Sequence, residues 1–455
     1  MSGSTPLDDP DRHPFAARPH RTLLALSLPV LISLVAEPLA GIADTAFIAR
    51  VGVGPLAALG VATSLLSGLF WAFNFLGIGT QTEVSAALGC GEPLRARRAA
   101  ALALGLAGAL GLVLAAVAYP VLEGVARWMG AQGAALDAAV TYLEIRLLGA
   151  PAMLIVLASF GALRGLHDMR TPLWIALSMS GLNALGDALL IFGAGPIPAL
   201  GVAGAAWATT ASQWLGAGWG VAAVARRLGL AGGIEPSQAL ALLAVGRDLF
   251  ARTGLLLFFQ LLMTRSANEI GAEAGAAHQA LRQCWMLTAL ILDAYAASAQ
   301  SLIAYFIGAR RAALAEGVAR VACLWSLATG CALAVLLLAA EQPVATLLVP
   351  PAAHGLFATA WWLLAVAQPL NALSFATDGI HWGTADYAYL RNAMLVSTGI
   401  GVALLLRVDP ASAGALTSVW LVATLWIGVR AAFGIARIWP GFGSSPLRDL
   451  RQERG

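Results

Sequence analysis

Long apolar stretches follow one another along almost the whole chain, and each contains few charged residues or none. Most are about 20 residues or longer, which is the length an α-helix needs to cross the hydrocarbon core of a bilayer. Only 11% of the 455 residues are charged, whereas a soluble domain carries about 25%. This pattern excludes a soluble enzyme, a disordered chain and a coiled coil, and it indicates a protein that crosses the membrane many times.

The hydropathy pattern predicts an all-α membrane protein with twelve transmembrane helices, because a backbone inside lipid must satisfy its own hydrogen bonds. The predicted spans are 22–48, 56–86, 98–119, 136–160, 171–192, 200–225, 248–269, 276–306, 318–340, 354–376, 386–407 and 411–437. The longest internal connection divides them into two lobes of six helices. We therefore predict a cytoplasmic N-tail, a first lobe, a cytoplasmic linker, a second lobe and a cytoplasmic C-tail over residues 1–21, 22–225, 226–247, 248–437 and 438–455.

The basic residues, all of them arginines, fall mainly on one side of the predicted spans. They lie in both tails and in alternate loops, whereas the opposite loops contain little more than Arg50, Arg127 and Arg407. Because cytoplasmic loops are enriched in Lys and Arg, we predict that both termini are cytoplasmic. We expect the chain in a bacterial-type cytoplasmic (inner) membrane, as a monomer among membrane lipids.

The composition and the motifs also exclude several functions. Without Lys the chain has no Schiff-base or P-loop lysine, and it has no nucleotide-binding loop that could couple it to ATP. The four cysteines show no CxxC spacing. A net charge of +3 is too small to indicate a nucleic-acid partner. We therefore expect no enzymatic activity and no cofactor beyond a coupling ion.

An internal repeat relates the two lobes. A shift of 219 residues pairs Gly52 with Gly271, Gln81 with Gln300 and Gly89 with Gly308, and a shift of 214–215 pairs Gly165 with Gly379 and His167 with His381. Both repeats have six spans and hence the same orientation, so the lobes should be related by an axis along the membrane normal. Parallel repeats of this kind are typical of secondary transporters.

The first lobe contains polar residues inside apolar spans, where ionisable groups are costly and mark functional sites. Asp44 lies on the first span, Asn183 and Asp187 share one face of the fifth, and Thr209 lies on the sixth. Two nearby carboxylates can hold one proton between them, or can bind Na⁺ through hard oxygen ligands when ionised. We predict that Asp44, Asn183 and Asp187 bind H⁺ or Na⁺, with Thr209 or the adjacent Thr210 contributing a hydroxyl.

Two residues of the first span are candidates for gating or for the substrate cavity. Glu37 lies seven residues before Asp44 and therefore faces roughly the same way. Pro29 leaves a backbone carbonyl without its usual partner and permits the helix to bend.

In this order and spacing, several motifs resemble the multidrug and toxic compound extrusion (MATE) transporters. They are Pro29 with the Ala-Asp-Thr-Ala run at 43–46, the stretch 163–172, Asn183-x3-Asp187 followed by Phe192-Gly193, and the run 201–209. The resemblance covers about 22–440 and is closest to the DinF-like branch, which Asp378-Gly379-Ile380 also suggests. It implies export driven by an inward H⁺ or Na⁺ gradient, an ion site at Asp44, Asn183, Asp187 and Thr209, a bending role for Pro29 and a cavity role for Tyr142.

Our hypothesis is a secondary active antiporter that exports amphipathic, often cationic, organic compounds in exchange for H⁺ or Na⁺. One alternative is a flippase for lipid-linked precursors from the same two-lobed superfamily. That alternative predicts a wide cationic central cavity, for which only Arg265 and Arg282 are candidates. A scaffold or receptor that transports nothing would leave the repeat and the buried acids without a purpose.

Overall fold

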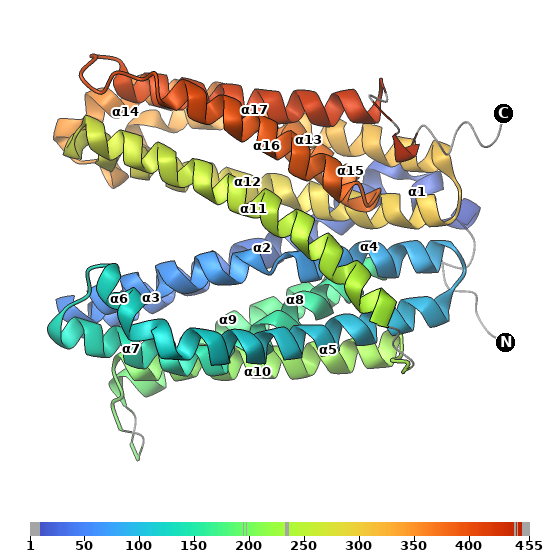
Figure 1. The fold of residues 1–455 in the computed structure, drawn as a ribbon, viewed down its shortest axis with the longest axis horizontal. Coiled ribbons are helices and arrows are strands. Elements are labelled where there is room, and N and C mark those ends of the chain that lie inside the picture. The colour runs from blue at the N-terminus through green and yellow to red at the C-terminus, as the bar shows by residue number, and fades with distance from the viewer. Residues whose placement is uncertain are drawn as a thin grey trace. The chain divides into compact units, whose positions relative to one another are not determined.

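The computed structural model describes residues 10–193, 195–196, 198–232, 236–440, 443 and 445–447. Parts of the predicted tails and of the predicted linker lie outside these residues. All regular secondary structure in the described part of the chain is helical (Figure 1). The structure thus confirms the all-α prediction.

The chain divides into two compact units, and each has its own helix bundle. The N-lobe comprises residues 28–246, and the C-lobe comprises the described residues of 1–27 and of 247–455. Two helices, α2 (Pro19–Ala49) and α11 (Pro236–Ile270), begin in one unit and continue in the other. The other N-lobe elements are α3 (Val53–Ala72), α4 (Phe75–Gly89), α5 (Pro93–Ala118), η2 (Tyr119–Val121), α6 (Leu122–Trp128), α7 (Gly133–Leu148), α8 (Ala150–Gly165), α9 (Arg170–Phe192) and α10 (Val202–Arg227).

The C-lobe begins with a short N-terminal segment and continues with the second set of long helices. Its elements are η1 (Pro10–Arg12), α1 (Pro14–Ala17), α12 (Ala272–Gly308), α13 (Ala312–Leu348), η3 (Pro351–Ala353), α14 (His354–Val366), α15 (Gln368–Gly383), α16 (Tyr387–Leu405) and α17 (Ala415–Ile438). The N-terminal segment packs on α12: the His13 ring lies 5.5 Å from that of Tyr305, and Asp11 forms an ion pair with Arg311 of the following turn.

The helices of the described chain account for all twelve predicted spans. Eight are long and apolar enough to cross a membrane, and two bent pairs bring the number to ten. The remaining two predicted spans correspond to α10 and α11, which carry more polar residues. The bent pairs are α7–α8, with 48° between the helices, and α14–α15, with 47°. In each pair a proline, Pro151 or Pro369, lies in the first turn after the break, where its missing N–H costs least.

The structure confirms the 219-residue repeat at the start of α3 and α12. Gly52 and Gly271 precede these helices with φ values of 151° and 150°, a conformation that only glycine adopts without strain. A close contact between helices repeats as well. A Cβ on Gly161 would lie 2.3 Å from the carbonyl oxygen of Gly77, and one on Gly379 would lie 2.3 Å from that of Ala296.

These contacts correct the second pairing. Gly161 corresponds to Gly379, a shift of 218, and His167 (φ 59°) corresponds to Ala385 (φ 57°). The predicted pairs Gly165–Gly379 and His167–His381 are therefore wrong by four residues. Four residues are about one helical turn, so the mistaken register places similar residues on the same face.

Candidate ion-binding site

Asp44 and Asp187 come together inside the N-lobe. Asp44 lies on α2 and is 7% exposed, whereas Asp187 lies on α9 and is completely buried. Their carboxyl groups are close enough to interact. Within the described chain, Asp44 Oδ1 and both carboxylate oxygens of Asp187 accept no hydrogen bond. Two ionised carboxylates have no proton to share, so a hydrogen bond between them requires a bound proton.

The sequence of α9 explains why Asn183 and Asp187 face inward. They are four residues apart on one face and both are buried, while Leu182 and Leu185 on the other faces are exposed. The helix thus points its polar stripe at the bundle and its leucines outward, as expected for a helix that faces lipid.

Small residues bring α10 close to this polar stripe. A Cβ on Gly204 would lie 2.5 Å from the carbonyl oxygen of Leu190, and one on Gly186 would lie 2.8 Å from Cβ of Ala208. Close approach of this kind lets side chains hydrogen-bond across helices. The amide of Asn183 donates to Thr209 Oγ1 at 3.2 Å, and that hydroxyl donates to the Ala205 carbonyl at 2.9 Å. The four predicted residues therefore lie together.

Arg146 on α7 belongs to the same site, although the sequence reasoning missed it. It is 6% exposed, its positive charge acts on Asp44, and its Nη1 donates to Oε1 of Gln213 on α10 at 2.8 Å. With both acids ionised, the three charged groups sum to −1. One bound proton makes the site neutral. The sequence does mark Arg146 as a candidate, since an arginine ten residues inside a predicted span is as unusual as an aspartate there.

The structure also places Tyr142 at this site, one turn before Arg146. Tyr142 is 2% exposed, and its hydroxyl interacts with Thr209. Thr210, the alternative to Thr209, instead donates to the carbonyl of Ile145 at 3.2 Å. Its hydroxyl serves helix packing rather than the acidic pair.

The two gating candidates lie on α2, which is helical throughout its described length. Pro29 lies inside this helix, two residues after the last α2 residue assigned to the C-lobe. The backbone of Glu37 is part of α2, but its side chain lies outside the described part of the structure. Its proposed role therefore stays a prediction.

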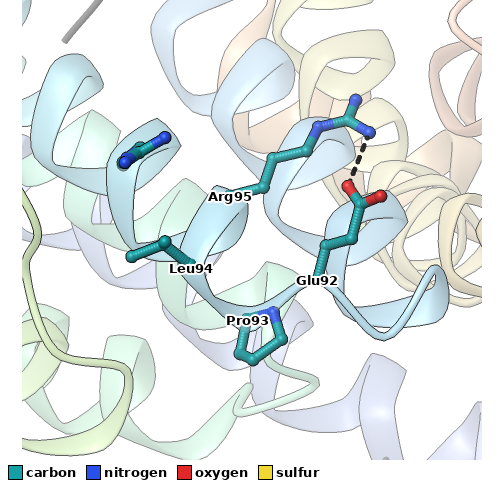
Figure 2. A pocket seen from close by; sticks show the side chains of 5 residues that line it. Glu92, Pro93, Leu94 and Arg95 are labelled. Atoms are coloured by element: carbon teal, nitrogen blue, oxygen red, sulfur yellow. Dashed lines mark hydrogen bonds and ion pairs between the residues drawn. The ribbon is translucent and has the colours of Figure 1, made fainter. Parts of the chain in front are cut away.

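A surface pocket at the start of α5 is separate from these residues. Glu92, Pro93, Leu94, Arg95 and Arg98 line it. Figure 2 shows the Arg95 side chain reaching back to Glu92; the two groups are 3.2 Å apart, and Arg95 also bonds Glu83 at 2.8 Å. Its charge is thus neutralised locally, and no candidate residue lines the pocket.

The C-lobe contains a different charged cluster. Asp378 lies inside α15, which extends to Gly383 and so beyond the predicted span 354–376. It is 5% exposed and bonds two buried arginines, Arg252 and Arg430. Unlike the N-lobe pair, this carboxylate accepts hydrogen bonds from arginine side chains within the described chain.

Comparison with known proteins identifies the family. The MatE family model matches residues 29–189 and 251–406, which is more than half of the chain. The chain belongs to the MatE family. The DNA damage-inducible protein F of Escherichia coli (strain K12) is 29% identical over 439 residues, covering 93% of each chain. This MATE chain is also 30% identical to the probable multidrug resistance protein NorM of Deinococcus radiodurans, covering 91% of this chain and 93% of that one.

A solved structure shows the same fold. The crystal structure of a MATE protein in the bent conformation superposes with a TM-score of 0.86 at 21% identity and covers 98% of both chains. The MATE assignment, the DinF-like relative and the apolar helices establish an integral membrane transporter of this family.

Proposed function

We propose that this MATE protein is a secondary active antiporter that exports amphipathic organic compounds, cationic ones among them, in exchange for a cation bound by Asp44 and Asp187. The single observation that carries the proposal is the buried pair of carboxylates in which Asp44 Oδ1 and both oxygens of Asp187 accept no hydrogen bond within the described chain. In a helix bundle such a pair is costly unless it binds a positive charge. Ion binding and substrate binding are coupled when each favours a different conformation of the protein.

We propose H⁺ as the coupling ion. A proton shared between Asp44 and Asp187 would give each carboxylate a hydrogen bond and would neutralise the −1 charge left by Arg146. Asn183 and Thr209 would hold the pair in place, since they hydrogen-bond to each other across α9 and α10.

Na⁺ is the second candidate. The site offers hard oxygen ligands from two carboxylates and from the hydroxyl of Thr209, and these suit an alkali or alkaline-earth cation. Among the described residues, no group of three His, Cys, Asp or Glu side chains could hold a metal ion. A proton needs only the two carboxylates, which is why we place it first.

The substrate proposal draws on the relatives. The Deinococcus relative is named for multidrug resistance, and family members of that kind act on small organic compounds. We further propose that the chain works as a monomer in a bacterial-type cytoplasmic membrane with both termini in the cytoplasm.

The test is reconstitution of the full chain in liposomes, with ethidium as the probe and with pH and Na⁺ gradients imposed separately. We expect the pH gradient alone to drive ethidium transport. If only a Na⁺ gradient drives transport, the coupling ion is Na⁺ and the H⁺ proposal is wrong. Gradient-independent scrambling of a fluorescent phospholipid, without ethidium transport, would contradict the antiporter and favour the flippase.

A further inference from the structure

Three charged side chains from three helices meet inside the C-lobe, and we call them the arginine cluster: Arg252 of α11, Asp378 of α15 and Arg430 of α17. Both guanidinium groups donate to the same oxygen, Asp378 Oδ2; Arg430 Nη2 lies 2.9 Å from it, and Arg252 bonds it through Nη2. All three residues are more than nine-tenths buried. The arginine cluster thus contains two positive charges and one negative charge.

The two acids next to the arginine cluster do not supply the missing negative charge. Asp248 lies one turn before Arg252 on α11, but it bonds Arg391 at 2.6 Å. Asp386 follows α15 and bonds Arg437 at 2.7 Å. His381, between Asp378 and Asp386, adds no negative charge in either protonation state. Within the described chain, each of these carboxylates therefore has its own arginine, and the excess positive charge stays in the cluster.

The arginine cluster also has hydrogen-bond donors to spare. Arg252 Nε and Arg430 Nη1 are buried and have no acceptor within the described chain. The guanidinium of Arg252 lies 5.4 Å from the Trp382 ring, and that of Arg430 lies 4.6 Å from the Trp426 ring. These rings hold the guanidinium planes and attract cations, but they carry no net charge. Buried charged donors normally have an acceptor.

We propose that the arginine cluster binds one small monovalent anion, a halide or a carboxylate. One negative charge would balance the excess, and its lone pairs would accept from the donors that Asp378 leaves unused. Both guanidinium groups bond one oxygen, so they lie close together and suit a small ligand. This proposal is independent of the coupling ion in the N-lobe.

The test uses the purified full-length protein in detergent at constant ionic strength. Sodium gluconate, whose carboxylate carries a five-carbon polyol chain and is too large for a site that fits a small anion, is replaced by sodium chloride or sodium acetate. A ligand that binds only the folded state stabilises it in proportion to ln(1 + [L]/Kd). We expect the unfolding temperature to rise with chloride or acetate concentration in this way. Fluorescence should change in parallel, since Trp382 and Trp426 lie against the guanidinium groups. A response to chloride alone identifies a halide site, and a response to acetate a carboxylate site.

Variants separate binding from a structural role. R430Q leaves the neutral pair of Arg252 and Asp378, so its anion affinity should fall at least tenfold, while its unfolding temperature in gluconate should not fall below that of the wild type. R252Q tests the same point if R430Q does not fold. D378N raises the net charge of the cluster and should bind the anion more tightly. A purely structural arginine would instead lower the unfolding temperature equally in all three salts.

Arg282 provides the matched control. It lies on α12, donates to Gln279 and forms no ion pair within the described chain. R282Q should respond to anions as the wild type does. The proposal would be overturned if the wild type had the same unfolding temperature and the same fluorescence in chloride, acetate and gluconate. A full anion response in R430Q would overturn it as well.

Discussion

Replacing Asp187 by Asn should separate ion coupling from folding. Asn has nearly the same shape as Asp, and its amide can donate to Asp44 Oδ1, which accepts no bond within the described chain. A hydrogen bond to a charged group contributes about 1.5–3 kcal/mol. The shared proton proposed for the wild type would supply an equivalent bond, so we expect D187N to fold and to unfold at about the wild-type temperature at pH 7.5.

The effect on transport follows from the charges at the site. The two acids and Arg146 sum to −1, so the pair should bind one proton per cycle. One pH unit corresponds to about 1.4 kcal/mol, or tenfold in concentration. With the membrane potential held at zero, the wild type should maintain about a tenfold substrate gradient per pH unit, whereas two protons per cycle would give about a hundredfold. D187N cannot release a proton from this position and should let the substrate gradient collapse.

The assay is ethidium distribution across proteoliposomes with a one-unit pH gradient, equal K⁺ on both sides and valinomycin. D137N is the matched control, since Asp137 is an exposed carboxylate on α7 of the same lobe. It should keep the wild-type gradient. A tenfold gradient retained by D187N would refute the assignment of the site, and a hundredfold gradient in the wild type would refute the single shared proton.

Three further predictions test the topology, the helix packing and the N-terminal segment. Cys90, exposed between α4 and α5, should react with a membrane-impermeant maleimide only from the cytoplasmic side. In the double variant C90S/V53C, the new cysteine at the start of α3 should react only from outside; the reverse labelling would overturn the predicted orientation. G379A should lower the unfolding temperature, because its Cβ would lie 2.3 Å from the α12 backbone and such overpacking costs about 1–3 kcal/mol; the control G399A, with nothing within 4 Å, should not. Burial lowers the pKa of His13 from 6.5 to about 4, so the N-terminal segment binds a proton more readily when it is detached from α12. Its packing on α12 should therefore be lost as the pH falls from 6.5 to 4. Unchanged hydrogen exchange at residues 14–18 over this range would contradict the prediction.

The sequence was sufficient for the features that depend on local composition. Every predicted span corresponds to one helix or to two consecutive helices, because hydropathy sums contributions from neighbouring residues and a membrane helix satisfies its own backbone. Asp44, Asn183 and Asp187 were recognisable because polar residues are rare at such positions, and the i,i+4 spacing alone placed the last two on one face. The motifs of the first lobe were enough to indicate the family.

The register of the second repeat motif could not be settled in the same way. A match displaced by four residues keeps helical faces in phase, so His167 could be paired with His381 as plausibly as with Ala385. Only the backbone conformation and the contacts of Gly161 and Gly379 with neighbouring helices distinguish the two alignments.

The tertiary structure alone decided which charges meet. Arg146 and Gln213 are 67 residues apart, and Arg252 and Asp378 are 126 apart, so no local pattern links them. A hydropathy scale counts each charged residue as unfavourable for its own helix. The free energy of burying that residue depends instead on the side chain it contacts on another helix. The sequence determined that charges lie inside the spans. Within the described chain, the packing of the helices leaves Asp44 and Asp187 without a hydrogen bond from an arginine, whereas Asp378 accepts from two arginines.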